Sequence, residues 1–213
     1  MTPPFKRFAL LLMVLTGIAP AADLTLTPQT DGLHIASPDS HLLLPYPTLI
    51  DTKKTKHLKP QKTTVTSDHT ATIDYDGDLH LQLTVNPAAG DFTYSTANPG
   101  DIKYLEIRTD LPITLKTGGT YQFGTNPAQP FPADYPGKPH LYQGNASPFL
   151  LRTPDGQDLL IQPPASSYQE PNDLREWNTP SFHWMSQPSL GDNTPRLTYH
   201  LEIITPVAPA PNP

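Results

Sequence analysis

The 213-residue sequence contains no cysteine. Catalysis by a thiol and a disulfide-stapled scaffold are therefore excluded, so stability must come from a buried core, for which a chain of this length suffices. Charged residues make up only 16% of the chain, and the formal net charge is −6. This composition argues against a coiled coil and against a general nucleic-acid-binding protein. We therefore expect no nucleic acid partner.

Long apolar runs are also missing, except within the first 22 residues. Phe8–Ile18 is apolar and follows the basic pair Lys6 and Arg7. This run is too short to span a bilayer, which takes about 20 helical residues. Because Ala19-Pro-Ala21 places small residues at the cleavage spacing, we interpret residues 1–22 as a signal peptide. The sequence thus predicts a secreted or periplasmic protein with no membrane span in the mature chain.

The mature chain lacks any convincing 3.6-residue apolar period, so little or no helix is expected. Residues 79–85 and 197–203 instead alternate strictly between apolar and polar side chains. Such alternation is typical of antiparallel strands with one face buried. Further strands are predicted within residues 24–27, 33–36, 41–44, 63–66, 70–75, 92–95, 102–108, 113–117, 120–124, 149–153, 158–162 and 181–185.

Turn residues separate many of these runs. Glycine tolerates the positive φ angles of tight hairpins, and four glycine-containing turns join neighbouring strands. They are Asp31-Gly32, Asp76-Gly77, Gly118-Gly119 and Pro154-Asp155-Gly156. So many short strands in one chain are best accommodated in two packed sheets. The predicted fold class is all-β, an antiparallel β-sandwich in one domain over residues 23–205.

Proline-rich stretches interrupt the strands. Because proline cannot donate a ladder hydrogen bond, Thr125–Pro148 and Pro163–Pro180 are predicted to be long loops. Both contain aromatic residues, which indicates that they are ordered. Residues 206–213 have neither aromatic nor anchoring residues, and are predicted to form a disordered Pro-rich tail.

The aromatic and polar residues of these two loops are the strongest functional candidates. Sugar rings stack their C–H faces on aromatic side chains, while carboxylate, guanidinium and imidazole groups fix their hydroxyls. The predicted carbohydrate-binding residues are Tyr135, His140, Tyr142, Tyr168, Arg175, Glu176 and Trp177. Trp177 is the expected stacking platform, whereas Phe182 and Trp184 share one strand face and are expected in the core. The alternative is that the loop rings form a minor core of their own.

Two further functions stay open at this stage. A polysaccharide lyase needs a base such as His140 or a tyrosine, and a glycoside hydrolase needs two carboxylates at a set separation. Glu170, Asp173 and Glu176 supply carboxylates, but no spacing singles out a catalytic pair. The other alternative is a structural or protein-interaction module of the cell envelope without catalytic activity.

Metal and cofactor motifs are not recognisable. Asp74, Asp76 and Asp78 invite a calcium interpretation, but Gly77 stands in the wrong position and a hairpin turn explains the pattern. The eight histidines show no zinc-binding spacing. No Gly-rich nucleotide-binding loop is present. We therefore expect neither a metal site nor a cofactor, and nothing in the sequence fixes an oligomeric state.

Lysine is concentrated in one short segment. Five lysines, Lys53, Lys54, Lys56, Lys59 and Lys62, fall within ten residues of an otherwise acidic chain. Such a segment attracts an acidic polysaccharide or an anionic surface, or else forms a solvated loop that protects a sheet edge from aggregation.

In strand density and loop aromatics, the mature chain resembles exported β-sandwich modules of polysaccharide-processing systems. These include jelly-roll domains and galactose-mutarotase-like supersandwich domains. The resemblance implies a sandwich fold and no particular catalytic residue.

Overall fold

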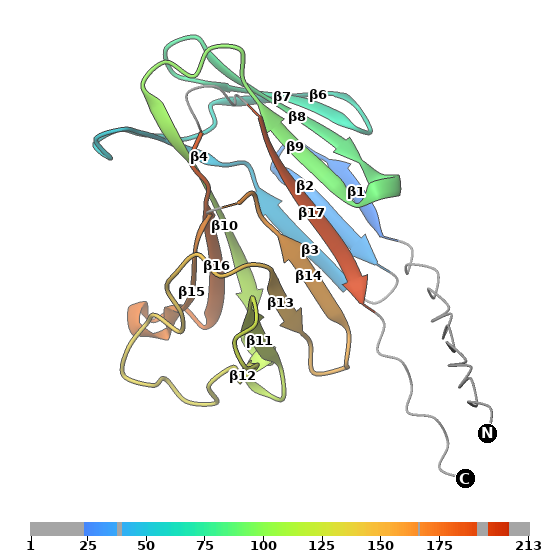
Figure 1. Cartoon of the computed structure of the whole chain (residues 1–213), viewed down its shortest axis with the longest axis vertical. Helices are drawn as coiled ribbons and strands as arrows, with labels where there is room; N and C mark the ends of the chain where they lie inside the picture. Colours follow the sequence, from blue (N-terminus) through green and yellow to red (C-terminus); the bar gives the residue numbers. More distant parts are fainter. Residues whose placement is uncertain (1–23, 38–39, 166, 191–195, 205–213) are drawn as a thin grey trace, which may run out of the picture.

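Antiparallel strands account for most of the structure. The computed structural model describes residues 24–37, 40–165, 167–190 and 196–204 (Figure 1). The predicted signal peptide and the predicted tail lie outside these residues. No helix in the described part is long and apolar enough to cross a bilayer. The only helical segments found there are three short 3₁₀ turns, so the prediction of an all-β fold with little helix is confirmed.

The largest sheet has nine strands in the order β12-β11-β13-β14-β17-β9-β8-β7-β6, all pairing antiparallel. In chain order its strands are β6 (Lys62–Ser67), β7 (Thr70–Tyr75), β8 (Leu79–Asn86), β9 (Asp91–Ser95), β11 (Thr120–Phe123), β12 (Gln129–Pro130), β13 (Phe149–Arg152), β14 (Asp158–Gln162) and β17 (Arg196–Ile204). A 3₁₀ turn, η1 (Pro87–Ala89), joins β8 to β9.

Two smaller sheets complete the fold. A five-stranded sheet runs β15-β16-β10-β4-β5, and a three-stranded sheet runs β1-β2-β3. The strands of the first are β4 (Thr48–Asp51), β5 (His57–Leu58), β10 (Ile102–Pro112), β15 (Tyr168–Asp173) and β16 (Ser181–Gln187). Those of the second are β1 (Thr25–Pro28), β2 (Gly32–Ser37) and β3 (Ser40–Pro45).

The two smaller sheets form the layer opposite the nine-stranded sheet. β3 lies beside β10, where the Thr109 hydroxyl donates to the Leu43 carbonyl. Across the layers, Trp184 of β16 stacks on Phe149 of β13, with ring centroids 5.4 Å apart. The arrangement is a β-sandwich whose core lies between the layers (Figure 1).

Alternation in the sequence sets which faces are buried. Along β8, Leu81, Leu83 and Val85 are buried and the residues between them are exposed. β17 shows the same period of two, as predicted. Phe182 and Trp184 are both completely buried, which confirms that they belong to the core.

The prediction of a strand over residues 113–117 is wrong. It forms a 3₁₀ turn, η2 (Ile113–Lys116), in which the Thr117 amide donates to the Thr114 carbonyl at 3.0 Å. The turn closes where the Gly119 amide donates to the Leu115 carbonyl at 2.8 Å. A Cβ at Gly119 would lie 2.7 Å from that carbonyl oxygen, so the close approach requires glycine.

The prediction that Pro163–Pro180 is all loop is also wrong. It contains β15 and a 3₁₀ turn, η3 (Leu174–Trp177). β15 is an edge strand, with β16 on one side only. Pro171 is tolerated there because its missing N–H interrupts no hydrogen-bond ladder between two strands. The strands β4 and β5 were also missed, as was the two-residue strand β12, which lies within the predicted loop Thr125–Pro148.

Candidate functional site

The outer edge of β15 carries the predicted site, because the first Pro-rich loop folds back against it. The Leu141 amide donates to the Pro171 carbonyl at 3.0 Å. Gly144 and Gln169 exchange two backbone hydrogen bonds, of 3.1 and 2.7 Å. Residues 139–144 therefore cover the edge of β15 as an irregular extra strand, which brings together side chains that are about 30 positions apart in the sequence.

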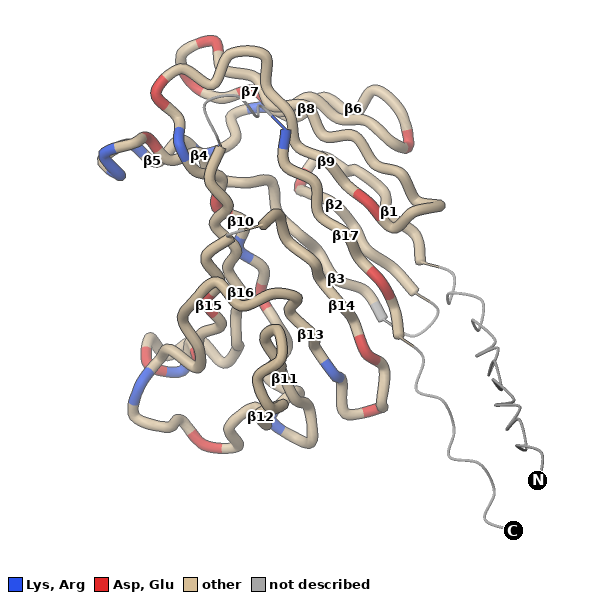
Figure 2. The backbone as a smooth tube through the Cα atoms, in the orientation of Figure 1, with Lys and Arg blue, Asp and Glu red and all other residues tan. Residues whose placement is uncertain are grey.

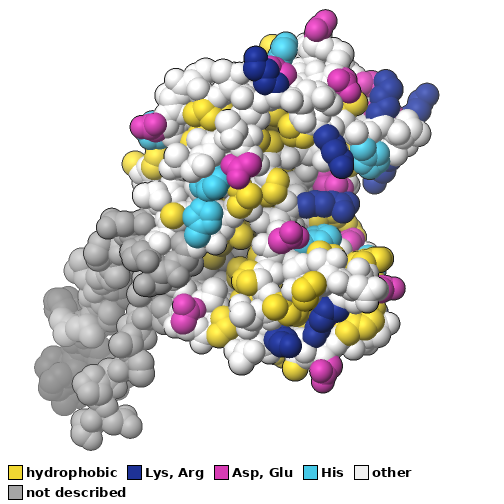
Figure 3. Space-filling view, turned by 180° about the vertical axis from the view of Figure 1, so that it is seen from behind, with side chains coloured by type: hydrophobic (Ala, Val, Ile, Leu, Met, Phe, Trp, Pro, Cys, Tyr) yellow, Lys and Arg dark blue, Asp and Glu magenta, His cyan; other side chains and the backbone are white. Residues whose placement is uncertain are grey.

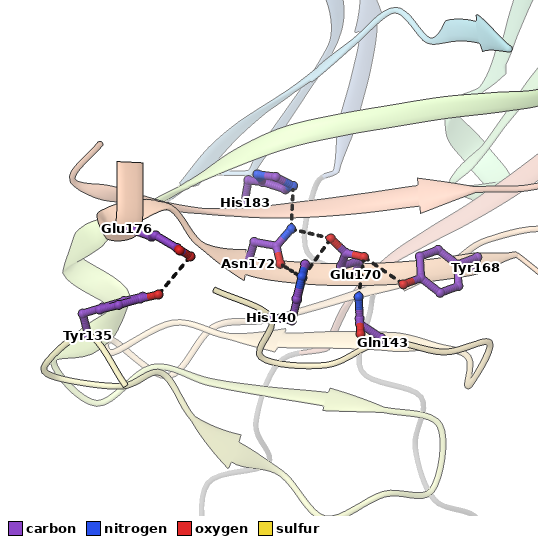
Figure 4. Close-up of polar contacts among 8 residues, drawn as sticks. All are labelled: Tyr135, His140, Gln143, Tyr168, Glu170, Asn172, Glu176 and His183. Atoms are coloured by element: carbon purple, nitrogen blue, oxygen red, sulfur yellow. Dashed lines mark hydrogen bonds and ion pairs between the residues drawn. The ribbon is translucent and has the colours of Figure 1, made fainter. Parts of the chain in front are cut away.

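Glu170 is the centre of a polar cluster on this edge (Figure 4). Its Oε1 accepts from the Asn172 amide at 2.7 Å and lies 3.2 Å from His140 Nδ1. Its Oε2 accepts from the Tyr168 hydroxyl at 2.8 Å and from the Gln143 amide at 3.0 Å. Both carboxylate oxygens are thus engaged, and the cluster joins the loop to the strand.

The environment of Glu170 favours its charged form. Burial raises the pKa of this carboxyl, but the hydrogen bonds from Asn172, Gln143 and Tyr168 and the nearby His140 outweigh burial, so the pKa lies below its usual value of 4.5. Burial and the adjacent Glu170 carboxylate raise the pKa of Tyr168 to about 12. Tyr168 therefore stays protonated at neutral pH and acts as a donor.

Because its folded-state pKa is lowered, ionised Glu170 stabilises the folded protein above the unfolded-state pKa, near 4.5. This contribution is lost as the pH falls through the folded-state value. We expect the free energy of unfolding, measured by urea titration, to fall between pH 5 and roughly pH 3. The fall should be smaller in Glu170→Gln. An equal fall in both proteins would show that Glu170 is not the group responsible.

Two histidines of the cluster differ in exposure. The His140 side chain is 46% exposed, and its Nδ1 lies 2.8 Å from Asn172 Oδ1 and 3.2 Å from Glu170 Oε1. Because both neighbouring oxygens accept, Nδ1 carries a proton. His183 lies within 3.4 Å of the Asn172 amide, and burial together with the charge of Arg108 lowers its pKa. His183 is therefore neutral at pH 7.

Arg175 fixes the end of the site nearest η3. It donates from Nε and Nη2 to the buried Asp173 carboxylate, at 2.8 and 2.5 Å. It also donates to the Ala133 and Pro132 carbonyls, at 2.7 and 2.9 Å. These contacts turn the guanidinium inward and tie the first loop to η3. Arg175 thereby positions the neighbouring residues of the site.

Trp177 is the most exposed aromatic side chain of this region. It ends η3, and 56% of its surface is accessible, whereas Trp184 has none. Beside it in the sequence, Glu176 accepts a hydrogen bond from the Tyr135 hydroxyl at 2.9 Å. Figure 4 shows this pair at one end of β15 and Tyr168 at the other.

Tyr142 lies apart from these exposed groups. Its ring stacks on Phe123, with centroids 4.1 Å apart, and its hydroxyl accepts from the Ala146 amide at 3.0 Å. This tyrosine packs against the core and anchors the loop, as the alternative interpretation of the loop rings expects.

Three members of the cluster are missing from the predicted carbohydrate-binding residues: Gln143, Asn172 and Glu170, the last of which was considered only as a candidate catalytic carboxylate. A signal for two of them exists, because Tyr168, Glu170 and Asn172 alternate with period two and share one face of β15. Pro171, which stands between Glu170 and Asn172, concealed this pattern. Gln143 has no comparable signal, since only the fold of the loop places it there.

In the described part of the chain, no three histidine, cysteine or acidic side chains lie together as a metal ion would require. Asp74, considered above for calcium, instead lies 2.8 Å from His80 across the hairpin.

No family model matches this chain. No curated protein matches it either. Among solved structures, it is similar to a GH31 family sulfoquinovosidase from E. rectale in complex with an aza-sugar inhibitor. The likeness covers 83% of this chain and 32% of that enzyme, with 9% sequence identity and a TM-score of 0.39. The chain thus spans about a third of the enzyme's length, and a likeness this low carries no inference about function.

Proposed function

We propose that this protein binds carbohydrate along the outer edge of β15. The observation that carries the proposal is the exposed ring of Trp177 at the end of η3, which directly follows β15 and its row of hydrogen-bonded polar side chains. A large aromatic surface that folding leaves accessible is available to stack on the apolar face of a sugar.

The polar groups along the outer edge of β15 have the chemistry that sugar hydroxyls require. Glu176, His140 and Tyr135 offer a carboxylate, an imidazole and a phenol, and the Glu170 cluster holds the loop behind them. Tyr168, at the far end of the row, extends it along the strand (Figure 4). A linear row of this kind suits a chain of sugars better than a single monosaccharide.

Affinity electrophoresis in gels that contain neutral or acidic polysaccharides tests this proposal. We expect at least one polysaccharide to retard the protein, and Trp177→Ala to weaken that binding about tenfold or more, since a few large aromatic side chains carry most of the affinity of a binding site. The urea midpoint of Trp177→Ala should stay close to that of the wild type, because the ring is exposed.

Val65→Ala is the matched control, because Val65 is the other exposed large apolar residue among those described, at 38%. It lies on β6, in the other layer, and its loss should leave retardation unchanged. Unfolding of Trp177→Ala, or retardation equal to that of the wild type, would contradict the proposal. Failure of every polysaccharide would favour a structural or protein-interaction role.

One observation favours a second candidate function, that of a polysaccharide lyase or glycoside hydrolase. His140 is exposed and its Nδ1 lies 3.2 Å from a carboxylate, which is the arrangement that orients a general base. Incubating the retarding polysaccharide with the protein and measuring new reducing ends or unsaturated products tests this function. Cleavage that persists in His140→Ala would rule His140 out as the base.

We also propose that the protein is exported and works in the periplasm or outside the cell. The support is the sequence pattern of residues 1–22. Protein purified from the secreted or periplasmic fraction should begin at or near Ala22 or Asp23 when its N-terminus is sequenced, and an intact N-terminus would contradict export by cleavage.

A further inference from the structure

The segment between β4 and β6 concentrates positive charge outside the proposed site. Residues 52–62 contain five lysines and no acidic residue. Figure 2 shows Lys and Arg positions at the tip of the β4–β5 hairpin, which projects from the sandwich. Figure 3 shows Lys and Arg side chains gathered along one upper edge of the back of the molecule. The rest of the chain is acidic, so this charge is local.

The hairpin is held in a fixed shape by Asp51, which is only 3% exposed. Asp51 Oδ1 accepts from the backbone amides of Thr55 and Lys56, at 2.6 and 3.0 Å, and Oδ2 accepts from the Thr55 hydroxyl at 2.9 Å. These hydrogen bonds lower the pKa of Asp51, because they outweigh the desolvation that would raise it. The carboxylate is thus committed to shaping the turn, which presents the lysines without a large loss of backbone entropy on binding.

The lysines differ in what surrounds them. Lys56 pairs with Asp101 at 3.1 Å, and the Lys54 ammonium lies 5.0 Å from the centre of the Tyr104 ring. All five lysines are exposed, Lys53 and Lys59 among them. A depression on one side of the hairpin is lined by Lys56 with Asp76, Asp78 and Asp101. An anionic ligand therefore meets favourable charge at the tip and unfavourable charge in the depression.

We propose that this hairpin is a docking surface for an acidic polysaccharide. Charge complementarity requires an anionic partner. A membrane surface fits less well, because the tip, residues 52–57, has no apolar side chain to enter the lipid. This inference does not depend on the Trp177 site, which lies beyond the opposite edge of the five-stranded sheet, next to β15.

Binding of polygalacturonate, with neutral dextran as the comparison, tests the proposal. Titration calorimetry on the full protein should detect polygalacturonate binding at low ionic strength, and this binding should weaken as salt is added. Dextran should show no salt-sensitive binding of this kind. Lys53→Gln/Lys59→Gln should weaken polygalacturonate binding by about tenfold. The matched control is Lys116→Gln/Arg196→Gln, which removes the same charge from two exposed positions elsewhere and should bind like the wild type.

The proposal would be overturned if the wild type did not bind polygalacturonate, or if the hairpin and control variants lost equal affinity for it. It would also be overturned if the protein bound only vesicles that contain phosphatidylglycerol, tested in parallel with polygalacturonate. Trp177→Ala separates this surface from the proposed sugar site, since it should retain the salt-sensitive component that Lys53→Gln/Lys59→Gln loses. Circular dichroism and the urea midpoint of each variant establish that it is folded.

Discussion

Replacing Trp184 with alanine is expected to lower the free energy of unfolding by about 3–5 kcal/mol, the usual cost of removing a large buried ring. Trp184 has no exposed surface, and it stacks on Phe149 across the two layers at an interplanar angle of 8°. Its indole N–H also donates to the Gln169 side chain at 3.2 Å. The substitution therefore leaves a cavity and a buried amide oxygen without its donor.

Urea unfolding, followed by circular dichroism, measures this loss. The midpoint should fall while the slope stays close to that of the wild type. Trp177→Ala removes the same side chain from an exposed position, so it serves as the control and should change the midpoint little. A loss below about 1 kcal/mol for Trp184→Ala would show that this ring does not join the two layers.

Arg175→Ala is expected to have the second largest effect, a loss of about 3 kcal/mol in the free energy of unfolding. Asp173 is completely buried, and its charge is balanced by the Arg175 guanidinium. Without that guanidinium, the carboxylate is buried unpaired, and the Ala133 and Pro132 carbonyls lose their donors. The loop that carries Tyr135 should then detach from η3.

This variant should also bind the retarding polysaccharide more weakly, although Arg175 itself faces inward. Arg175→Lys should lie between alanine and the wild type, because one ammonium group cannot reproduce the paired contacts of a guanidinium. Affinity electrophoresis and urea unfolding of both variants make the comparison. Full stability in Arg175→Ala would mean that the buried pair does not hold the loop.

The strands of the sandwich were predictable where the alternating pattern is strong, as in β8 and β17. One face of each strand packs against the core and the other faces solvent, so apolar and polar residues alternate with a period of two in the sequence. β15 was not predictable, because Pro171 normally argues against a strand. Only the position of β15 at the edge of its sheet, where a loop covers it, makes that proline acceptable.

The candidate site was predictable in part, for a similar reason. The predicted residues Tyr135 and Glu176 meet, although 41 positions separate them, and Trp177 is exposed. Their role in binding stays a prediction. The Glu170 cluster depends on the contact between residues 139–144 and β15, which no local pattern encodes. Tyr142 could not be distinguished from the exposed rings, because its neighbour Phe123 comes from a distant strand.

The two tryptophans of this chain allow a direct test of whether sugar stacks on Trp177. Trp184 is buried and Trp177 is 56% exposed, so acrylamide should quench mainly the fluorescence of Trp177. We expect the polysaccharide that retards the protein, at a saturating concentration, to protect this fluorescence from acrylamide. Quenching that is unchanged at saturation would contradict this expectation, because the ring would then remain open to solvent while the sugar is bound.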